Sequence, residues 1–600
     1  MSCSLAGVVP GSDARFPEMP SVKRDSGPSL PSNQSTSSTQ SSTSSMSRIL
    51  PSTTFGKVAR WLSNGRLCRF PEEQPGFTLS SEYLSCLSIA SSQTSTSATE
   101  IHKEILSNED HHSIIDSGSS NPTTRGFHPE IRPNGTILVS WYNPEDQDNP
   151  HCWPSWIKFM VYFQINFYTF IVYMSSSIFS AAQPEFMDTH EVPTSVGSLG
   201  LALVLLGYGV GALLFSPLSE IPAIGRNPPY VISMALFVLV SGLAVAIDSV
   251  PGFLVLRFLQ GFFGSPCLAT GAASLTDITE LVNIPYGLWI WGTCAVAAPA
   301  IAPCIAGFSI TANGWKWSMW EILWGAAPCL ILLLFLPETS VPTILHQRAA
   351  RLRTLTGNQS LKAPSEIDSS RYSVRSLVHE ALITPWKINA LDPAILFTTL
   401  YTALVYAIFY SFFEVFPLVY QGIYNMSTAS TGLVFLAAII AVLIVMPFYC
   451  LFIHYYIAQP IRNGNFPPPE RRLIPALFIS LFVPTGMYLF AWTSRADINW
   501  TVPTVGFMLI MMGVITLLQC MFGYMAVAYP NHSASLFAMN DFARSTLAFA
   551  AILWSGPLYR NLGVARGTSL VGALTVPCVF GIFILYWLGP ELRKRSRFAA

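Results

Sequence analysis

Twelve runs of apolar residues constrain the fold of this chain more than any other feature of its sequence. A helix crosses the hydrocarbon core of a bilayer with about 20 apolar residues, so each run predicts one membrane-spanning helix. The runs occupy residues 158–182, 195–216, 229–248, 251–275, 286–310, 316–337, 393–416, 430–455, 473–493, 501–525, 534–556 and 568–589. A polar stretch at 338–390 separates six runs from six, which predicts an all-α membrane protein with two homologous six-helix halves.

The composition also indicates a bilayer as the surrounding medium. Hydrophobic residues make up 51% of the chain and charged residues 11%, whereas soluble domains carry about a quarter charged residues. The net charge is zero, which argues against nucleic acid as a partner. The 11 cysteines show neither CxxC nor zinc-type spacing, and no GxxxxGK[ST] loop occurs. The sequence therefore predicts no metal, no cofactor and no ATP-driven step.

Five parts are expected along the chain. Residues 1–150 are rich in Ser and are expected to form a disordered cytosolic tail. Residues 151–337 and 391–590 are expected to form the two halves, joined by a cytosolic central loop at 338–390, with a basic cytosolic C-terminus at 591–600. Cytosolic loops carry the excess of Lys and Arg, and these segments hold most of the basic residues between the runs, so both termini are predicted to be cytosolic.

One candidate modification site lies on the other side of the predicted membrane. The connection between the seventh and eighth runs contains no Lys or Arg, which predicts an extracellular position. Asn425 opens the sequon "NMS" in this connection and is a candidate for glycosylation.

The stretch "SPLSEIPAIGRNPP" at 216–229 joins the second and third runs on the predicted cytosolic side. Its Leu218, Glu220, Gly225 and Arg226 resemble the signature loop of the major facilitator superfamily, although Glu replaces Asp and the first arginine is missing. The segment "SEIPAIGR" resembles the version found in fungal twelve-span drug:proton antiporters. An acid and an arginine in so short a loop predict a cytosolic gate held by an ion pair. The alternative is that Arg226 only sets the topology.

Charged residues inside the apolar runs are the candidates for proton coupling, because a charge within the bilayer is costly and usually functional. The candidates are Glu414, Arg257, Asp541, Arg544 and Glu321. Arg257 resembles part of the superfamily's second signature. Asp541 and Arg544 lie three residues apart on one helix face, so a fixed ion pair is the alternative there. For Arg257 the alternative is a fixed internal ion pair, and for Glu321 an interfacial position among tryptophans. For Glu414 the alternative is a position at the interface, or a hydrogen bond to a neighbouring helix that matters only for folding.

The fifth run, "GTCAVAAPAIAPCIAGF", keeps the two prolines of an antiporter motif but has Ala in place of its glycines. Proline removes a backbone hydrogen bond, so Pro299 and Pro303 are expected to bend this helix. Aromatic and polar side chains of several runs are expected to line a cavity suited to large, mostly apolar ligands, with packing or lipid contact as the alternative. The candidates are Asn166, Tyr173, Gln260, Tyr406, Tyr410, Gln519 and Tyr524.

The resemblance implies a proton-coupled efflux antiporter for drugs, toxins or secondary metabolites, related to exporters of azoles, benomyl or cycloheximide. Its partners would be a small-molecule substrate, protons and the bilayer, and we expect a monomer in the plasma membrane, or alternatively in the vacuolar membrane. A proton symporter that imports a nutrient has the same architecture and remains the main alternative. A membrane sensor would use the long tail as its output. A multispan enzyme is disfavoured because no cluster of histidines or paired acids occurs.

Overall fold

The computed structural model describes residues 49–74, 76–79, 83–87, 129–132, 135–143, 145–369, 383, 385–529 and 533–596. All of them belong to one compact unit, Met46–Ala600. Within these ranges, twelve helical segments, some made of several consecutive helices, are long and apolar enough to cross a membrane, which confirms the predicted membrane-spanning fold. Proline in the first turn starts several of them, where its missing N–H costs no helical hydrogen bond.

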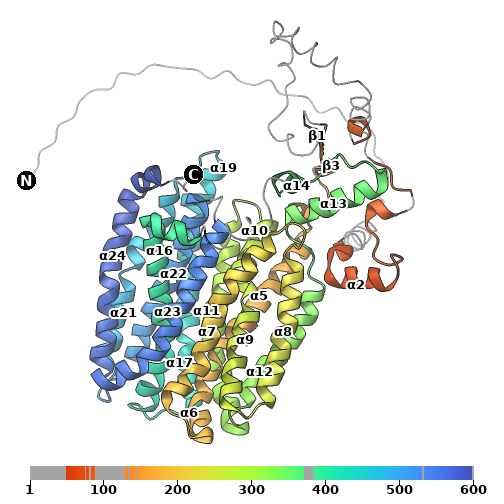
Figure 1. The fold of residues 1–600 in the computed structure, drawn as a ribbon. Helices are drawn as coiled ribbons and strands as arrows, with labels where there is room; N and C mark the ends of the chain where they lie inside the picture. The colour runs from red at the N-terminus through yellow and green to blue at the C-terminus, as the bar shows by residue number, and fades with distance from the viewer. Residues whose placement is uncertain are drawn as a thin grey trace, which may run out of the picture. The chain divides into compact units, whose positions relative to one another are not determined.

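The first half of the fold contains six spans. They are α5 (Ser155–Ser177) with α6 (Phe179–His190), α7 (Thr194–Glu220), α8 (Asn227–Ala246), α9 (Val250–Gly264) with α10 (Pro266–Ile278), α11 (Ile284–Asn313) and α12 (Trp317–Leu334). The bundle has two ends. The end that carries α13 (Val341–Thr356) and the last turn of α24 (Val564–Arg595) is called the terminal face (Figure 1). The other end, where α6 lies, is the opposite face (Figure 1).

The second half repeats this arrangement. Its spans are α16 (Pro393–Phe416) with η4 (Pro417–Gln421), α17 (Thr428–Phe435) with α18 (Ala437–Ile453), η5 (His454–Ala458) and α19 (Gln459–Arg462), η6 (Pro469–Leu473) with α20 (Ile474–Ile479) and α21 (Phe482–Thr493), α22 (Thr501–Ala528), α23 (Ser533–Leu562) and α24 (Val564–Arg595).

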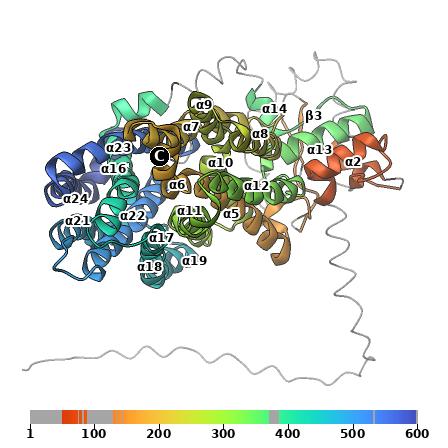
Figure 2. The ribbon, with the colours of Figure 1, turned by 90° about the horizontal axis from the view of Figure 1, so that it is seen from below.

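Two helix pairs supply most of the packing between the halves: α7 packs on α23, and α11 packs on α17 (Figure 2). Small residues make the second contact close. A Cβ atom added to Gly432 would lie 2.4 Å from the carbonyl oxygen of Pro303, and one added to Gly307 would lie 3.0 Å from the Cα of Ala429. The proline-containing helix α11 is therefore part of the seam between the halves, and glycine in the partner helix permits the approach.

The expectation that residues 1–150 form a disordered tail is wrong for the parts that the structure describes. They contain η1 (Leu50–Ser52), α2 (Thr54–Leu62), η2 (Pro71–Glu73), η3 (Pro150–Cys152) and the strands β1 (Glu130–Ile131) and β2 (Ile137–Leu138). The central loop is folded as well, into α13 (Val341–Thr356), β3 (Leu361–Lys362) and α14 (Pro364–Ser369). Strand β2 pairs antiparallel with β1 and parallel with β3.

A buried arginine explains why these two segments fold together. Arg348 of α13 is fully buried and bonds Asp146 and Asp148 at 2.7 Å each, with Glu72 at 3.7 Å. Its guanidinium also lies 4.2 Å from the ring centre of Tyr142. Three acids of the tail thus neutralise a charge of the central loop, and apolar side chains from both segments bury one another beside it. Neither segment contains this core alone, which is why local composition failed to predict it.

Candidate functional site

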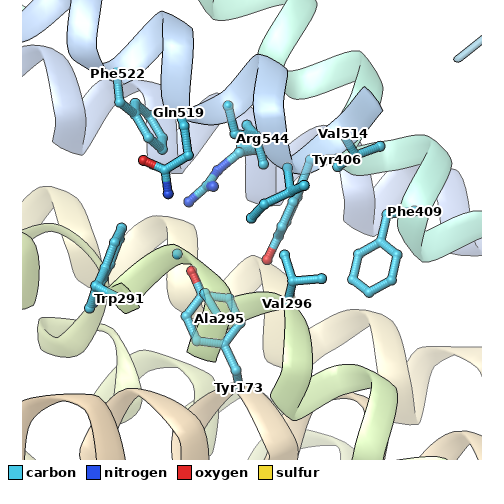
Figure 3. A pocket seen from close by; sticks show the side chains of 13 residues that line it. Tyr173, Trp291, Ala295, Val296, Tyr406, Phe409, Val514, Gln519, Phe522 and Arg544 are labelled. Atoms are coloured by element: carbon cyan, nitrogen blue, oxygen red, sulfur yellow. The ribbon is translucent and has the colours of Figure 1, made fainter. Parts of the chain in front are cut away.

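A small cavity lies between the two halves of the fold (Figure 3). Its volume is about 30 Å³, which holds a water molecule or two, whereas drug-sized ligands need pockets of several hundred Å³. Its lining is mostly aromatic and aliphatic and comes from both halves. The lining residues are Tyr173, Trp291, Gly292, Ala295, Val296, Tyr406, Phe409, Val514, Ile515, Leu518, Gln519, Phe522 and Arg544.

The polar side of the cavity is an arginine supported by an acid. Arg544 forms an ion pair with Asp541 one turn earlier in α23, and both side chains are buried. The Arg544 guanidinium lies 4.6 Å from the ring centre of Tyr406 and 5.4 Å from that of Phe522. A cation over aromatic faces beside an apolar cavity suits a flat, mostly apolar ligand that carries a few hydrogen-bonding groups.

Contacts between the halves close the cavity on both sides. Toward the terminal face, the rings of Trp289 and Tyr449 stack with centres 4.3 Å apart, and Gln519 donates to the backbone oxygen of Leu288 at 3.1 Å. Toward the opposite face, Arg560 donates to the hydroxyl of Thr194 at 3.1 Å. Among the residues that the structure describes, these contacts leave no route for a large ligand on either side, which corresponds to an occluded state.

The predicted cavity residues divide into two groups. Tyr173, Tyr406 and Gln519 line the cavity. Tyr410 lies just beyond it, where its hydroxyl is 2.9 Å from that of Ser176 in the other half and 3.5 Å from that of Tyr406.

The other three predicted cavity residues do not line it in this conformation. Asn166 bonds the backbone of its own helix, and Tyr524 is buried elsewhere. Gln260 bonds Arg257 and the hydroxyl of Ser241 inside the first half. The sequence could not separate the two groups, because it does not reveal which helix face points toward the other half.

Glu414 connects the halves near the opposite face. It lies on α16 of the second half and is 7% exposed. Its carboxylate accepts a hydrogen bond from the hydroxyl of Ser198 at 2.9 Å and one from the amide of Gln183 at 3.4 Å. Both donors belong to the first half, on α7 and α6. The carboxylate therefore bridges the two halves on the side of the cavity that faces away from the termini.

Arg257 is held by neutral oxygens. The guanidinium donates to the backbone oxygens of Gly200 at 2.7 Å and Ser175 at 3.1 Å, and to the side chain of Gln260 at 2.6 Å. It is fully buried, and within the described ranges it forms no ion pair. The fixed internal ion pair that the sequence offered as the alternative to proton coupling is therefore not formed among the described residues, and backbone carbonyl groups hold the guanidinium instead.

In the signature loop, the partner of Arg226 is Asp277, at the end of α10, and not Glu220 as the sequence predicted. The two side chains are 2.7 Å apart. Burial opposes the charge of Arg226, but Asp277 outweighs it and holds the pKa of the guanidinium above its ordinary value. Glu220, the last residue of α7, is exposed and bonds neither residue of this pair.

Glu338 is a second acid that contacts the signature loop and that the sequence analysis did not identify. It accepts hydrogen bonds from the backbone N–H groups of Arg226 at 3.1 Å and Asn227 at 3.3 Å, and so caps the start of α8. Asp277 and Glu338 each follow closely on a predicted span, on the same side of the membrane as the signature loop. This shared position is the sequence feature that could have identified them as partners of the loop.

We expect Gly225→Ala to lower the stability of the protein. Gly225 has a φ of +81°, and an added Cβ would lie 2.5 Å from Oε2 of Glu338 and 2.8 Å from Cγ2 of Thr343. Backbone strain and displacement of the cap should together cost about 1 kcal/mol or more. Thermal unfolding of the purified protein measures this. Gly357→Ala is the matched control, because Gly357 has a φ of +71° but open space around it, and equal losses in both variants would contradict the role of the cap.

The remaining predicted sites lie outside the cavity. Glu321 is half-buried on α12, near the opposite face. Asn425 is exposed in the connection between η4 and α17, with a φ of +54°. Within the described ranges, no group of three or more His, Cys, Asp or Glu side chains is placed to hold a metal ion.

Comparison with known proteins finds relatives among fungal transporters. Residues 165–553 match the model of the Major Facilitator Superfamily. The MFS-type transporter pyvG of Aspergillus violaceofuscus is 52% identical over 92% of this chain and 100% of that protein. The cycloheximide resistance protein of Candida maltosa is 32% identical over 92% and 100%, and fluconazole resistance protein 1 of Saccharomyces cerevisiae is 35% identical over 78% and 86%.

A solved structure shows the same fold. The proton:xylose symporter XylE aligns over 72% of this chain and 96% of its own, with a TM-score of 0.53 and 13% identity. At this low identity, the similarity shows only that the fold, with its two six-helix halves, is shared. It gives no information about the cargo.

Proposed function

Because the chain belongs to the major facilitator superfamily, we propose that it exports small molecules in exchange for protons by alternating access. The observation that carries this proposal is the position of Glu414. Its carboxylate is on one half and its two hydrogen-bond donors are on the other, so opening of the opposite face must break both bonds. A proton acceptor is thus exposed to one side of the membrane in one state and buried in the other.

This geometry supports an exchange of cargo for protons in the following steps. In the state that is open at the opposite face, Glu414 takes up a proton from outside while cargo leaves the cavity. The neutral carboxyl needs no compensating charge, so the halves can close again around it. Tyr406, Tyr410 and Glu414 recur every fourth residue on one face of α16, which links the carboxyl to the cavity where Arg544 and Asp541 lie. Opening at the terminal face then releases the proton and admits the next cargo molecule.

The cargo that suits this cavity is a mostly apolar, flat molecule with a few polar groups. Tyr173, Trp291, Tyr406 and Phe522 supply aromatic surface, and Arg544 supplies charge that Asp541 balances. The names of the fungal relatives refer to cycloheximide and fluconazole resistance and to multidrug transport. We therefore propose drugs, toxins or secondary metabolites as the cargo class. We propose further that the protein works as a monomer and catalyses no chemical conversion, since one chain contains both halves and the cavity between them.

We propose that the terminal face is cytosolic and that the protein resides in the plasma membrane. The ends of the spans on this face carry Arg462, Arg471 and Arg472 and the basic last turn of α24, as the positive-inside rule requires of a cytosolic face. In this orientation, the cavity opens to the outside of the cell at the Glu414 end.

Epitope tags should show this orientation. A tag inserted after Asn425 is expected to bind antibody on intact cells, whereas a tag inserted after Gly464 should bind only after permeabilisation. Both positions are exposed loop residues with left-handed backbone geometry, which suits insertion. Equal binding to both tags on intact cells would contradict the span count, and the reverse pattern would contradict the orientation.

Reconstituted vesicles test the function itself. With the terminal face outward and the lumen acidified, labelled fluconazole or cycloheximide should accumulate inside, and collapse of the pH gradient should stop the accumulation. Each uptake event should be accompanied by alkalinisation of the lumen, which a pH-sensitive dye inside the vesicle reports. Cargo movement in the same direction as the protons would identify a symporter and overturn the proposed exchange.

A further inference from the structure

Helix α2 presents an apolar face that no part of the described structure covers. Phe55, Val58, Trp61 and Leu62 follow one another at helical spacing and are 43%, 48%, 77% and 70% exposed. Among the described residues, Trp61 has the largest exposed fraction of any large apolar side chain. The other side of the helix is packed, since Gly56 is buried and a Cβ added there would lie 2.0 Å from the backbone oxygen of Leu50.

Contacts with two spans place α2 at the level where the membrane-crossing helices end. The hydroxyl of Thr54 donates to the side-chain oxygen of Asn227, the first residue of α8, at 2.8 Å. The ring centre of Phe55 lies 4.9 Å from that of Phe335, which directly follows α12 and is itself 43% exposed. In Figure 1, α2 lies at the outer edge of the molecule, below α13 and beside the upper part of the bundle. The exposed face of α2 is thus continuous with lipid-facing surface.

Basic residues accompany this apolar face. Between Thr54 and Arg69 the chain has Lys57, Arg60, Arg66 and Arg69 and no acidic residue. Glu73 forms an ion pair with Arg60, whereas Arg66 and Arg69 are exposed. An amphipathic helix with tryptophan and leucine on one side and basic residues beside them is suited to the boundary between acyl chains and anionic headgroups.

We propose that α2 is an interfacial helix that binds the anionic phospholipids of the leaflet on the terminal face, with Phe55, Val58, Trp61 and Leu62 in the acyl region. The lipid proposal rests on the proposed orientation in one respect. Anionic phospholipids lie in the cytosolic leaflet, so the terminal face has to be the cytosolic one. The helix also touches the gate, because Asn227, its partner, is the residue whose backbone N–H bonds Glu338. Lipid bound to the exposed face of α2 therefore contacts a helix that is itself hydrogen-bonded to the first residue of α8.

Photolabelling of the full-length protein in nanodiscs tests the proposal. The discs contain phosphatidylcholine alone or phosphatidylcholine with phosphatidylserine, together with a phosphatidylcholine probe that carries a diazirine in its acyl chain. Leu62 and Leu84 form a matched pair, being 70% and 54% exposed, but only Leu62 lies on the amphipathic helix. Mass spectrometry should find carbene adducts on 55–62 and none at Leu84. Phosphatidylserine should raise the labelling by a factor of about five for each basic side chain near the surface.

Two variants separate the apolar and the charged contributions. The double variant Trp61→Ser, Leu62→Ser should reduce labelling of 55–62 to the level of Leu84. Arg66→Glu should keep the labelling in phosphatidylcholine but lose most of the increase with phosphatidylserine. Adducts on Leu239, an exposed residue of α8, should be unchanged in both variants, which shows that the fold is intact.

Two results would overturn the proposal. One is labelling of 55–62 no stronger than that of Leu84 in discs that contain phosphatidylserine. The other is protection of α2 from hydrogen exchange that appears only in discs with two protein copies, because a second chain would then cover this face. Neither result depends on transport, so failure of the lipid contact and failure of the proposed export are distinguished by separate assays.

Discussion

Glu414→Gln is expected to abolish proton-driven transport while leaving the protein folded and able to bind cargo. Glutamine keeps the size of the side chain, and its oxygen can still accept the hydrogen bonds from Ser198 and Gln183, but it takes up no proton. Accumulation of labelled cargo in vesicles with a pH gradient should fall to the level seen without a gradient. Exchange of labelled for unlabelled cargo without a gradient should continue, because Glu414 does not line the cavity.

Two further variants make this result specific. Glu414→Asp retains a titratable carboxyl and should keep part of the driven transport, although the shorter side chain weakens the bridge between the halves. Glu321→Gln is the control for loss of an acid near the same face, since Glu321 lies on α12, outside the cavity lining. If Glu414→Gln still concentrates cargo at the normal rate while Glu321→Gln does not, the coupling carboxyl is misassigned.

The contacts on the two sides of the occluded cavity differ in whether they include a titratable group. Side chains of both halves meet on either side of a space of about 30 Å³, so cargo enters only after one set of contacts breaks. The contacts toward the opposite face include a titratable carboxylate, Glu414, whereas those toward the terminal face are the Trp289–Tyr449 stack and the bond of Gln519 to the backbone. Proton binding from outside therefore acts on one side of the cavity and leaves the other unchanged.

The membrane-spanning helices were predictable from the sequence because the requirement is local. A run of about 20 apolar residues has to cross the bilayer wherever it occurs in the chain, and Pro and Gly mark its ends. The folded parts of the tail and the central loop were not predictable in this way. Their order depends on Arg348 meeting Asp146 and Asp148, which are 202 and 200 residues away along the chain.

The candidate sites show the same division between local and long-range information. The superfamily resemblance located Arg226 in a gate-like loop but not its partner. The predicted partner, Glu220, was wrong, because Arg226 pairs with Asp277, which the sequence analysis did not consider. Glu414 stood out as the only acid of its run, yet its partners on the other half, Ser198 and Gln183, carry no signal in a single sequence.

Asp541→Asn is expected to have the largest effect on stability. Both members of the Asp541–Arg544 pair are buried, so loss of the acid leaves a buried guanidinium uncompensated. Breaking such a pair from one side costs about 3–5 kcal/mol, whereas removing both charges is often neutral. Thermal unfolding of the purified protein should therefore show a large loss for Asp541→Asn and recovery in the double variant Asp541→Asn, Arg544→Met.

The double variant also decides what the pair does. Arg544 lines the cavity over Tyr406, and Asp541 balances its charge, so their joint removal should leave a folded protein with an uncharged cavity. We expect cargo binding to weaken and driven transport to fall, because the cation beside the aromatic rings is gone. Wild-type transport by a double variant of wild-type stability would show that the pair is a fixed structural element, the alternative that its spacing on one helix face also permits. Glu414 would then be the only buried carboxylate described between the halves that remains a candidate for coupling.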